Sequence, residues 1–241
     1  MAGILYAIPT PLGGLAADSL PASALQTVKS LRYFVVENAK SARAFLKDVG
    51  MPCPLQGLDV LVLESDVAKH IKQLQKDISI GLLSEAGCPA IADPGALLVE
   101  AAQRENIRVV PLVGPSSIVL ALMASGLEGQ RFAFCGYLPR DKNEREKKIR
   151  EIENRSRRER ETQIFIETPY RNDVLLAALL ETCSPGTLLC VASDLTLPSE
   201  QINTRSIPAW RSARHAIGKR PTVFLLASVN RQPGARGKVE Q

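Results

Sequence analysis

The chain has 241 residues, of which 45% are hydrophobic and 23% are charged, an ordinary balance for a globular protein of one large domain or two small ones. Its formal net charge of +5 permits a nucleic-acid partner without requiring one. An aromatic content of 5% argues against a protein that binds single strands by stacking their bases. No apolar run approaches the roughly 20 residues that span a membrane, so no membrane partner is expected.

The first half of the chain alternates short apolar runs with amphipathic runs. The apolar runs predict strands over 3–8, 33–36, 60–63, 78–83 and 107–110. The amphipathic runs predict helices over 21–30, 41–48 and 67–76, and a further helix with Asp93 as its N-cap and Pro94 as its first residue. This alternation predicts an α/β fold with a mostly parallel sheet and helices on both faces.

Within this half, the stretch 78–95 reads as strand, loop and helix. In an open α/β sheet, the loop at the carboxyl end of a strand is where a ligand usually lies. Small residues such as Ala86 and Gly87 would let backbone groups approach a ligand closely.

The second half continues after the proline-rich segment 111–115, which we expect to be a hinge. Strands are predicted over 131–136, 163–166, 188–193, 201–207 and 222–228, and helices over 116–125, 172–182 and 209–217. The densely charged segment 141–160 predicts a solvated helix with some disorder. We therefore expect an N-terminal α/β domain over 1–112 on the acceptor side, a C-terminal α/β domain over 113–229 and a disordered tail over 230–241.

Cysteine and histidine spacing gives no sign of a metal centre. No two cysteines form a Cys-x-x-Cys pair, and they do not cluster with the histidines. We expect no bound metal and no disulfide framework, but free thiols in a reducing cytoplasm. The residues concerned are Cys53, Cys88, Cys135, Cys183, Cys190, His70 and His215. Both histidines lie in helical patterns without evident partners, and no role is assigned to them.

Three common ligand-binding signatures are missing from the sequence. No Gly-x-Gly-x-x-Gly follows the first strand, and no Gly-x4-Gly-Lys-Ser/Thr or Gly-x-Ser-x-Gly occurs. A dinucleotide-binding fingerprint, an NTPase phosphate loop and an α/β-hydrolase nucleophile are therefore unsupported.

Four short segments, in order, carry a family resemblance that runs from about residue 4 to residue 227. They are Ile8-Pro9-Thr10-Pro11-Leu12-Gly13, Ser84-Glu85-Ala86-Gly87-Cys88-Pro89 with Asp93-Pro94-Gly95, Val113-Gly114-Pro115-Ser116-Ser117, and Glu167-Thr168-Pro169-Tyr170-Arg171. The set resembles the S-adenosylmethionine-dependent tetrapyrrole methylase superfamily. Within that superfamily, it is most similar to the branch that methylates a ribose 2′-hydroxyl of small-subunit ribosomal RNA.

The resemblance implies two α/β domains with S-adenosylmethionine bound, folded, in the cleft between them, and a homodimer. It also implies a set of donor-binding residues, which act largely through backbone groups. In the first half these are Pro11, Ser84, Glu85, Ala86, Pro89, Ile91, Ser116, Ser117 and Ile118. In the second half they are Glu167, Tyr170, Ala192, Ser193, Pro221 and Thr222.

Two motifs depart from the ribosomal branch. Where that branch has Glu-Asp-Thr-Arg, this chain has Glu37-Asn38-Ala39-Lys40, and where it has Ser-Asp-Ala-Gly-Thr-Pro, this chain has Ser84-Glu85-Ala86-Gly87-Cys88-Pro89. The first departure falls where the acceptor should lie, so it bears on the acceptor more than on the donor.

A hydroxyl acceptor must lose its proton when it attacks the methyl carbon, which makes a general base useful. Glu37 and Lys40 are the catalytic candidates, because they follow a predicted strand. The alternative is that Glu37 caps the next helix and Lys40 is solvated.

Other candidates also have two interpretations. Ser116 and Ser117 bind the donor or cap a helix, and Glu85 binds a hydroxyl or amino group of the donor or is a loop carboxylate. Residues 142–160 either bind phosphates or form a surface helix with salt bridges.

Three functions follow from these observations. The first is a cytoplasmic, dimeric methyltransferase that acts on a ribose hydroxyl of ribosomal RNA, free or within a ribosomal subunit. The second is a methyltransferase that acts on a small, tetrapyrrole-like molecule. The third is a non-catalytic RNA-binding relative that kept the fold and the donor pocket.

Overall fold

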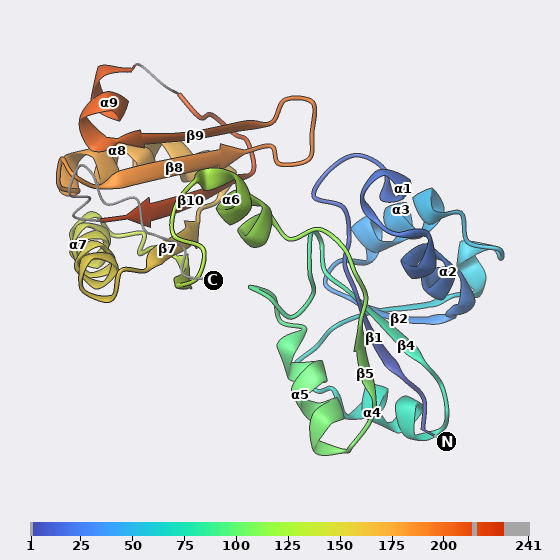
Figure 1. Ribbon diagram of the computed structural model, residues 1–241. Coiled ribbons are helices and arrows are strands. Elements are labelled where there is room, and N and C mark those ends of the chain that lie inside the picture. Colours follow the sequence, from blue (N-terminus) through green and yellow to red (C-terminus); the bar gives the residue numbers. More distant parts are fainter. Residues whose placement is uncertain (1, 214–215, 229–241) are drawn as a thin grey trace, which may run out of the picture. The chain divides into compact units, whose positions relative to one another are not determined.

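The computed structural model describes residues 2–213 and 216–228, so His215 and the predicted tail 230–241 lie outside the described residues. The chain divides into two compact units, residues 1–117 and residues 118–241 (Figure 1). Each unit has its own sheet, and each is described by itself.

The first unit is built on a five-stranded sheet in the order β3-β2-β4-β1-β5. All its pairings are parallel. The strands are β1 (Leu5–Ile8), β2 (Tyr33–Val36), β3 (Asp59–Val62), β4 (Ile80–Leu83) and β5 (Val109–Pro111). The helices are α1 (Ala16–Ser19), α2 (Ala22–Ser30), α3 (Ala39–Val49), the 3-10 turn η1 (Leu55–Gly57), α4 (Ala68–Gln75) and α5 (Ala96–Arg104).

Helices cover both faces of this sheet because successive side chains of each strand point to opposite sides. On β2, Phe34 and Val36 pack with α2 and α3, while Tyr33 and Val35 pack with α4 and α5. The parallel sheet with helices on both faces that the sequence predicts is confirmed for this unit.

The second unit has a five-stranded sheet of mixed direction, in the order β6-β7-β10-β8-β9. Its strands are β6 (Phe132–Tyr137), β7 (Thr162–Ile166), β8 (Leu188–Ser193), β9 (Gln201–Ser206) and β10 (Thr222–Ala227). Its helices are α6 (Ser117–Ser125), α7 (Lys142–Glu159), the 3-10 turn η2 (Pro169–Arg171), α8 (Asn172–Thr182) and α9 (Ile207–Ser212). Helices α7, α8 and α9 share one apolar core with the strands.

The mostly parallel sheet that the sequence predicts for the first half of the chain does not extend to this second unit. Only β6 and β7 are parallel, and the other three pairings are antiparallel. Strands β8 and β9 follow each other without a helix between them, and such a short connection can join only antiparallel neighbours.

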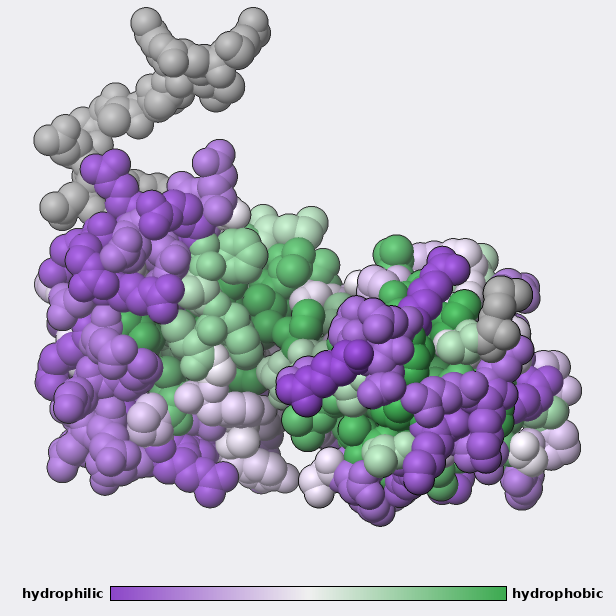
Figure 2. Space-filling model, turned by 90° about the horizontal axis from the view of Figure 1, so that it is seen from below, coloured by the Kyte–Doolittle hydropathy of each residue, from purple (hydrophilic) through white to green (hydrophobic). Residues whose placement is uncertain are grey.

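Helix α7 corrects the expectation of a solvated and partly disordered segment. It is a continuous helix of 18 residues, and the side chain of Asp141 caps it by accepting a hydrogen bond from the backbone N–H of Glu144 at 3.0 Å. Ile149 and Ile152 are buried in the apolar core. Hydrophilic residues cover much of the second unit on the side where α7 lies (Figure 2).

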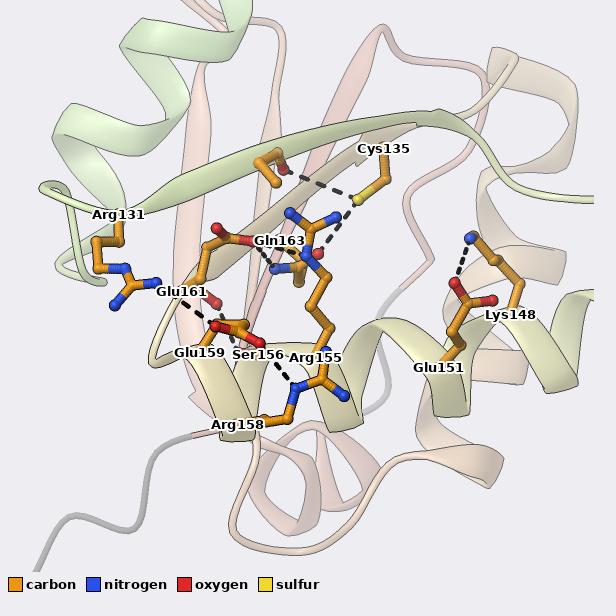
Figure 3. Close-up of polar contacts among 11 residues, drawn as sticks. Arg131, Cys135, Lys148, Glu151, Arg155, Ser156, Arg158, Glu159, Glu161 and Gln163 are labelled. Atoms are coloured by element: carbon orange, nitrogen blue, oxygen red, sulfur yellow. Dashed lines mark hydrogen bonds and ion pairs between the residues drawn. The ribbon is translucent and has the colours of Figure 1, made fainter.

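The exposed side of α7 carries several ion pairs, as the interpretation of 142–160 as a salt-bridged surface helix predicts. Lys148 pairs with Glu151 at 2.8 Å and Arg155 with Glu161 at 3.0 Å (Figure 3). Glu161 also accepts a hydrogen bond from the amide of Gln163 on β7, so the pairs continue from the helix onto the sheet.

Two further helix starts differ from the prediction. Helix α5 begins at Ala96 with Gly95 as its N-cap, so Asp93 is not the cap. Helix α9 runs from Ile207 to Ser212 rather than over 209–217, because Ser206 caps it and Pro208 fits its first turn.

His70 also differs from expectation, because it does have a partner. Its Nδ1 lies 3.1 Å from the hydroxyl of Tyr33, and the ring is fully buried. Burial lowers the pKa of His70, which therefore helps to pack α4 against the sheet as a neutral ring. Across the described residues, no helix has the length and apolar character that a membrane crossing requires.

Candidate functional site

The first unit has a topological switch point between its neighbouring strands β1 and β4. The chain leaves β1 toward the face covered by α2 and α3, and it leaves β4 toward the opposite face, where α5 packs. In open α/β sheets a ligand binds at the carboxyl ends of two such strands. The loops at this point are 9–15 and 84–95.

These two loops are joined by backbone hydrogen bonds. The N–H of Thr10 donates to the carbonyl of Gly87 at 2.9 Å, and the N–H of Gly87 donates to the carbonyl of Thr10 at 3.0 Å. The hydroxyl of Ser84 donates to the same Gly87 carbonyl at 2.9 Å. Residues far apart in the sequence thus form one short antiparallel bridge across the ends of the strands.

The loop after β5 packs against the same place. The thiol of Cys88 lies 3.4 Å from the carbonyl oxygen of Pro115, and a Cβ on Gly114 would overlap the ring of Pro9. The structure therefore brings together most of the donor residues predicted in this unit: Pro11, Ser84, Glu85, Ala86, Pro89, Ser116 and Ser117. Ile91 lies further along the β4 loop and is exposed, and Ile118 lies in α6 in the second unit.

The β4 loop holds two alanines in the left-handed region. Ala90 has a φ of +66° and Ala92 a φ of +62°, a conformation that costs energy for residues with a Cβ. Oδ1 of Asp93 accepts hydrogen bonds from the N–H groups of Ala90 and Gly95, both at 2.7 Å. Such strain is typical of ligand-binding loops, and Asp93 stabilises it.

Glu37 lies at the end of β2, beside this loop. Its Oε2 accepts a hydrogen bond from the N–H of Glu85 at 3.4 Å. Burial raises the pKa of Glu37, the hydrogen bond from Glu85 lowers it, and the charges of Asp93 and Glu85 raise it again, with a net upward shift. A carboxylate with a raised pKa is a better proton acceptor, which suits a general base.

The N-cap of α3 is Asn38, so the alternative in which Glu37 caps that helix is wrong. Oδ1 of Asn38 accepts from the N–H groups of Lys40 at 2.9 Å and Ser41 at 3.4 Å. Asparagine and aspartate cap helices about equally well. The departure from the ribosomal branch at this position therefore preserves a structural task. Lys40 is exposed on the first turn of the helix.

The second unit gathers its predicted donor residues at one edge of its sheet. Because β10 is antiparallel to β7 and β8, its first residues lie beside the last residues of those two strands. Ser193 pairs with Thr222, and their hydroxyls are 2.9 Å apart. Ala192, Pro221 and Glu167 adjoin this pair by register.

Glu167 is almost fully buried at this edge. Its Oε1 accepts from the N–H of Thr168 at 2.7 Å, and its Oε2 lies 3.3 Å from the guanidinium of Arg171. Tyr170 is different, because 78% of it is exposed and the ammonium of Lys219 lies 5.0 Å from its ring centre.

Asn172 is a candidate that the sequence analysis did not identify. Its amide nitrogen donates to the carbonyls of Gly218 at 3.1 Å and Arg220 at 2.7 Å, and it also reaches the Thr222 hydroxyl at 3.4 Å. Its Oδ1 is buried and has no hydrogen-bond partner within the described ranges. Its position directly after the fourth motif is the signal that could have identified it.

These groups fit the donor that the resemblance implies. Hydroxyls and an amino group of S-adenosylmethionine need acceptors, and the second unit offers carboxylate, hydroxyl and amide oxygens at one sheet edge. The small residues of the first unit leave backbone groups accessible. Among the described residues, no group of three or more His, Cys, Asp or Glu could hold a metal ion.

Comparison with known proteins gives one matching family, described as Tetrapyrrole (Corrin/Porphyrin) Methylases, over residues 5–208. Curated relatives carry the name Ribosomal RNA small subunit methyltransferase I. The relative from Bacillus subtilis is 35% identical over 199 residues, covering 83% of this chain and 66% of the relative. The relative from Vibrio cholerae is 33% identical over 201 residues, covering 83% and 68%. The match thus spans about two thirds of the length of these relatives.

Two solved structures share the fold. The crystal structure of the methyltransferase CobJ has a TM-score of 0.63 at 19% identity and covers 95% of both chains. Uroporphyrin-III-C-methyltransferase from Thermus thermophilus has a TM-score of 0.53 at 18% identity and covers 94% of both chains.

Proposed function

Because the chain belongs to the tetrapyrrole (corrin/porphyrin) methylase family, we propose that it transfers a methyl group from S-adenosylmethionine to a ribose 2′-hydroxyl of small-subunit ribosomal RNA. The family that the four motifs predict is confirmed, as is the fold class. The acceptor is proposed from the relatives, whose names specify ribosomal RNA of the small subunit. The observation that carries the proposal is the convergence of the motif-bearing loops at the switch point of the first sheet.

S-adenosylmethionine supplies a methyl carbon that is already activated by its bond to a positively charged sulfur. The protein therefore has to align donor and acceptor and exclude water. We assign binding of the donor to backbone groups of the loop residues of the first unit and to Glu167, Ser193 and Thr222 of the second. Asn172 joins this set through its buried, unpartnered Oδ1.

The acceptor hydroxyl has to lose a proton as the new carbon–oxygen bond forms and the carbon–sulfur bond breaks. We assign the proton to a carboxylate oxygen of Glu37, which lies beside the β4 loop. Lys40 is exposed on the same helix start, so we assign it contact with a phosphate of the acceptor rather than proton transfer.

Transfer of labelled methyl groups tests the proposal directly. We expect label from S-adenosylmethionine to appear in small-subunit RNA and not in a small-molecule extract. Label found only in the extract would establish the tetrapyrrole-like alternative. Calorimetric binding of the donor without transfer to either pool would establish the non-catalytic alternative. No donor binding at millimolar concentration would exclude both transferase functions.

We also propose that the protein works in the cytoplasm as a homodimer. All five cysteines are free thiols, which suits a reducing compartment. Light scattering after gel filtration measures the oligomeric state, and a monomeric mass would exclude the dimer.

A further inference from the structure

A pocket of about 420 Å³ lies in the first unit beside the motif-bearing loops. Its walls are the loop 10–15, the side of α3 that carries Ala44, Phe45 and Asp48, and the two residues Glu85 and Ala86. A volume of several hundred Å³ is typical of a site for a small ligand or part of a larger one. The donor residues proposed above include Pro11, Glu85 and Ala86, so the pocket adjoins the proposed donor site.

The walls are apolar with two carboxylates and no basic residue among those that line the pocket. The apolar side chains that line the pocket include Leu12, Leu15 and Phe45, and Leu15 is 57% exposed. A phosphate group would be repelled by Asp48 and Glu85. A flat apolar ring with hydrogen-bond donors on its edge matches both features.

In each of the two carboxylates, one oxygen accepts a hydrogen bond from the protein and the other is available to a ligand. Oδ2 of Asp48 accepts from the N–H of Ala16 at 2.6 Å, and Oε1 of Glu85 accepts from the hydroxyl of Ser41 at 3.3 Å. Within the described part of the chain, Oδ1 of Asp48 and Oε2 of Glu85 have no hydrogen-bond partner. Two positioned acceptors therefore remain for a ligand.

We propose that this pocket holds the base of the methylated nucleotide, turned out of its stack, and that its two carboxylates select a base with an exocyclic amino group. Carboxylates accept hydrogen bonds from the amino groups of bases, and enzymes that modify RNA or DNA commonly extrude the target nucleotide into such a pocket. The inference rests on the proposed function, because it requires RNA as the acceptor.

Filling the pocket tests its role. Ala44 is exposed on α3, so Ala44→Trp occupies the pocket from a position where the fold has room. The matched control is Ala177→Trp, at an exposed position of α8 in the other unit. The assay uses unmodified small-subunit RNA transcribed in vitro and labelled donor, and thermal melting checks that both variants fold.

We expect Ala44→Trp to lower methyl transfer about a hundredfold, the order of effect that a misplaced acceptor produces, with the donor Kd unchanged. Ala177→Trp should match the wild type in both measurements. Equal transfer by the two variants would overturn the proposal, and so would loss of donor binding by Ala44→Trp, because the pocket would then belong to the donor. No transfer by the wild type would refute the proposed function itself, and this inference with it.

A second variant does not depend on the tolerance of a large side chain. Asp48→Asn keeps an acceptor for Ala16 but removes the charge, and we expect the KM for RNA to rise about tenfold with the donor Kd unchanged. Digestion of the labelled RNA to nucleosides identifies the base. Label on cytidine, adenosine or guanosine supports the selection of an amino group, and label on uridine overturns it.

Discussion

Glu37 is the residue whose environment bears most directly on the proposed chemistry. It accepts a hydrogen bond from the N–H of Glu85, and partial burial together with the neighbouring carboxylates raises its pKa above the usual value of a glutamate. Glu37 can act as a general base only when its carboxyl group is ionised. Its titration should therefore be visible in the reaction.

We expect the transfer rate of the wild type to fall as the pH drops through the raised pKa of Glu37, because a protonated carboxyl cannot accept the proton of the hydroxyl. Glu37→Gln should lower kcat about a hundredfold to ten-thousandfold and abolish this acidic limb. The pH profile of kcat measures both effects. A Gln variant with the wild-type profile would assign the base elsewhere.

Arg160 has a strained backbone conformation at a position outside the candidate site. It follows the last turn of α7 with a φ of +52° and a ψ of +50°, the left-handed conformation that glycine adopts without cost. Arg160→Gly should raise the free energy of unfolding by up to about 1 kcal/mol. Urea denaturation measures the change, and methyl transfer should be unaffected. A loss of stability would show that the arginine side chain contributes more than its backbone costs.

At the scale of the elements, the start of α3 explains how the chain departs from the ribosomal branch without losing structure. Asn38 caps the helix through its Oδ1, as an aspartate would. The asparagine in place of aspartate at position 38 therefore keeps the helix cap, and the neighbouring Glu37 remains available for proton transfer.

Two variants separate these roles. Asn38→Ala should cost about 1 kcal/mol of stability, because two backbone N–H groups lose their acceptor. Asn38→Asp should retain stability and activity, since a negative charge at a helix N-terminus is favourable. Thermal melting and the transfer assay measure the pair. A strong loss of activity in Asn38→Asp would show that the amide itself contacts the acceptor.

The packing of the β5 loop against the β1 loop leaves no space at Gly114. A Cβ there would overlap the ring of Pro9, which cannot move away as a flexible side chain could. Gly114→Ala should therefore destabilise the protein by about 1–3 kcal/mol. Gly57→Ala is the control, since no atom lies within 4 Å of the Cβ it would add. Similar melting temperatures for the two variants would contradict this account.

At the scale of the whole molecule, the net charge of +5 bears on how RNA would bind. Contacts between basic residues and phosphates release counterions, so their strength falls as salt rises. We expect the KM for RNA to increase steadily between low and physiological potassium chloride concentrations, while the calorimetric donor Kd changes little. A KM that does not respond to salt would assign recognition to base contacts alone.

Local sequence patterns predicted most of the elements and, through the four motifs, the family. They could not predict how the second sheet pairs, because β8, β9 and β10 read the same whether they run parallel or antiparallel. The charged run 142–160 was predicted to be solvated and partly disordered because charged residues dominate it. Its few apolar residues, Ile149 and Ile152, are nevertheless buried in the core and determine which side of α7 packs against the sheet.

The candidate site, too, could be predicted from the sequence only in part. Motif position predicted which loops carry donor residues, and those roles remain predictions. The bonds between Thr10 and Gly87, the buried Oδ1 of Asn172 and the raised pKa of Glu37 depend on neighbours far along the chain. No local pattern contains that information.

The paired bonds between Thr10 and Gly87 have a kinetic consequence. Neither loop can move away from the other without breaking both hydrogen bonds. The two loops therefore open together, at one shared rate. A molecule that clamps either loop will slow the exposure of both amide protons to solvent. The bridge thus couples the ends of two strands that lie more than seventy residues apart in sequence.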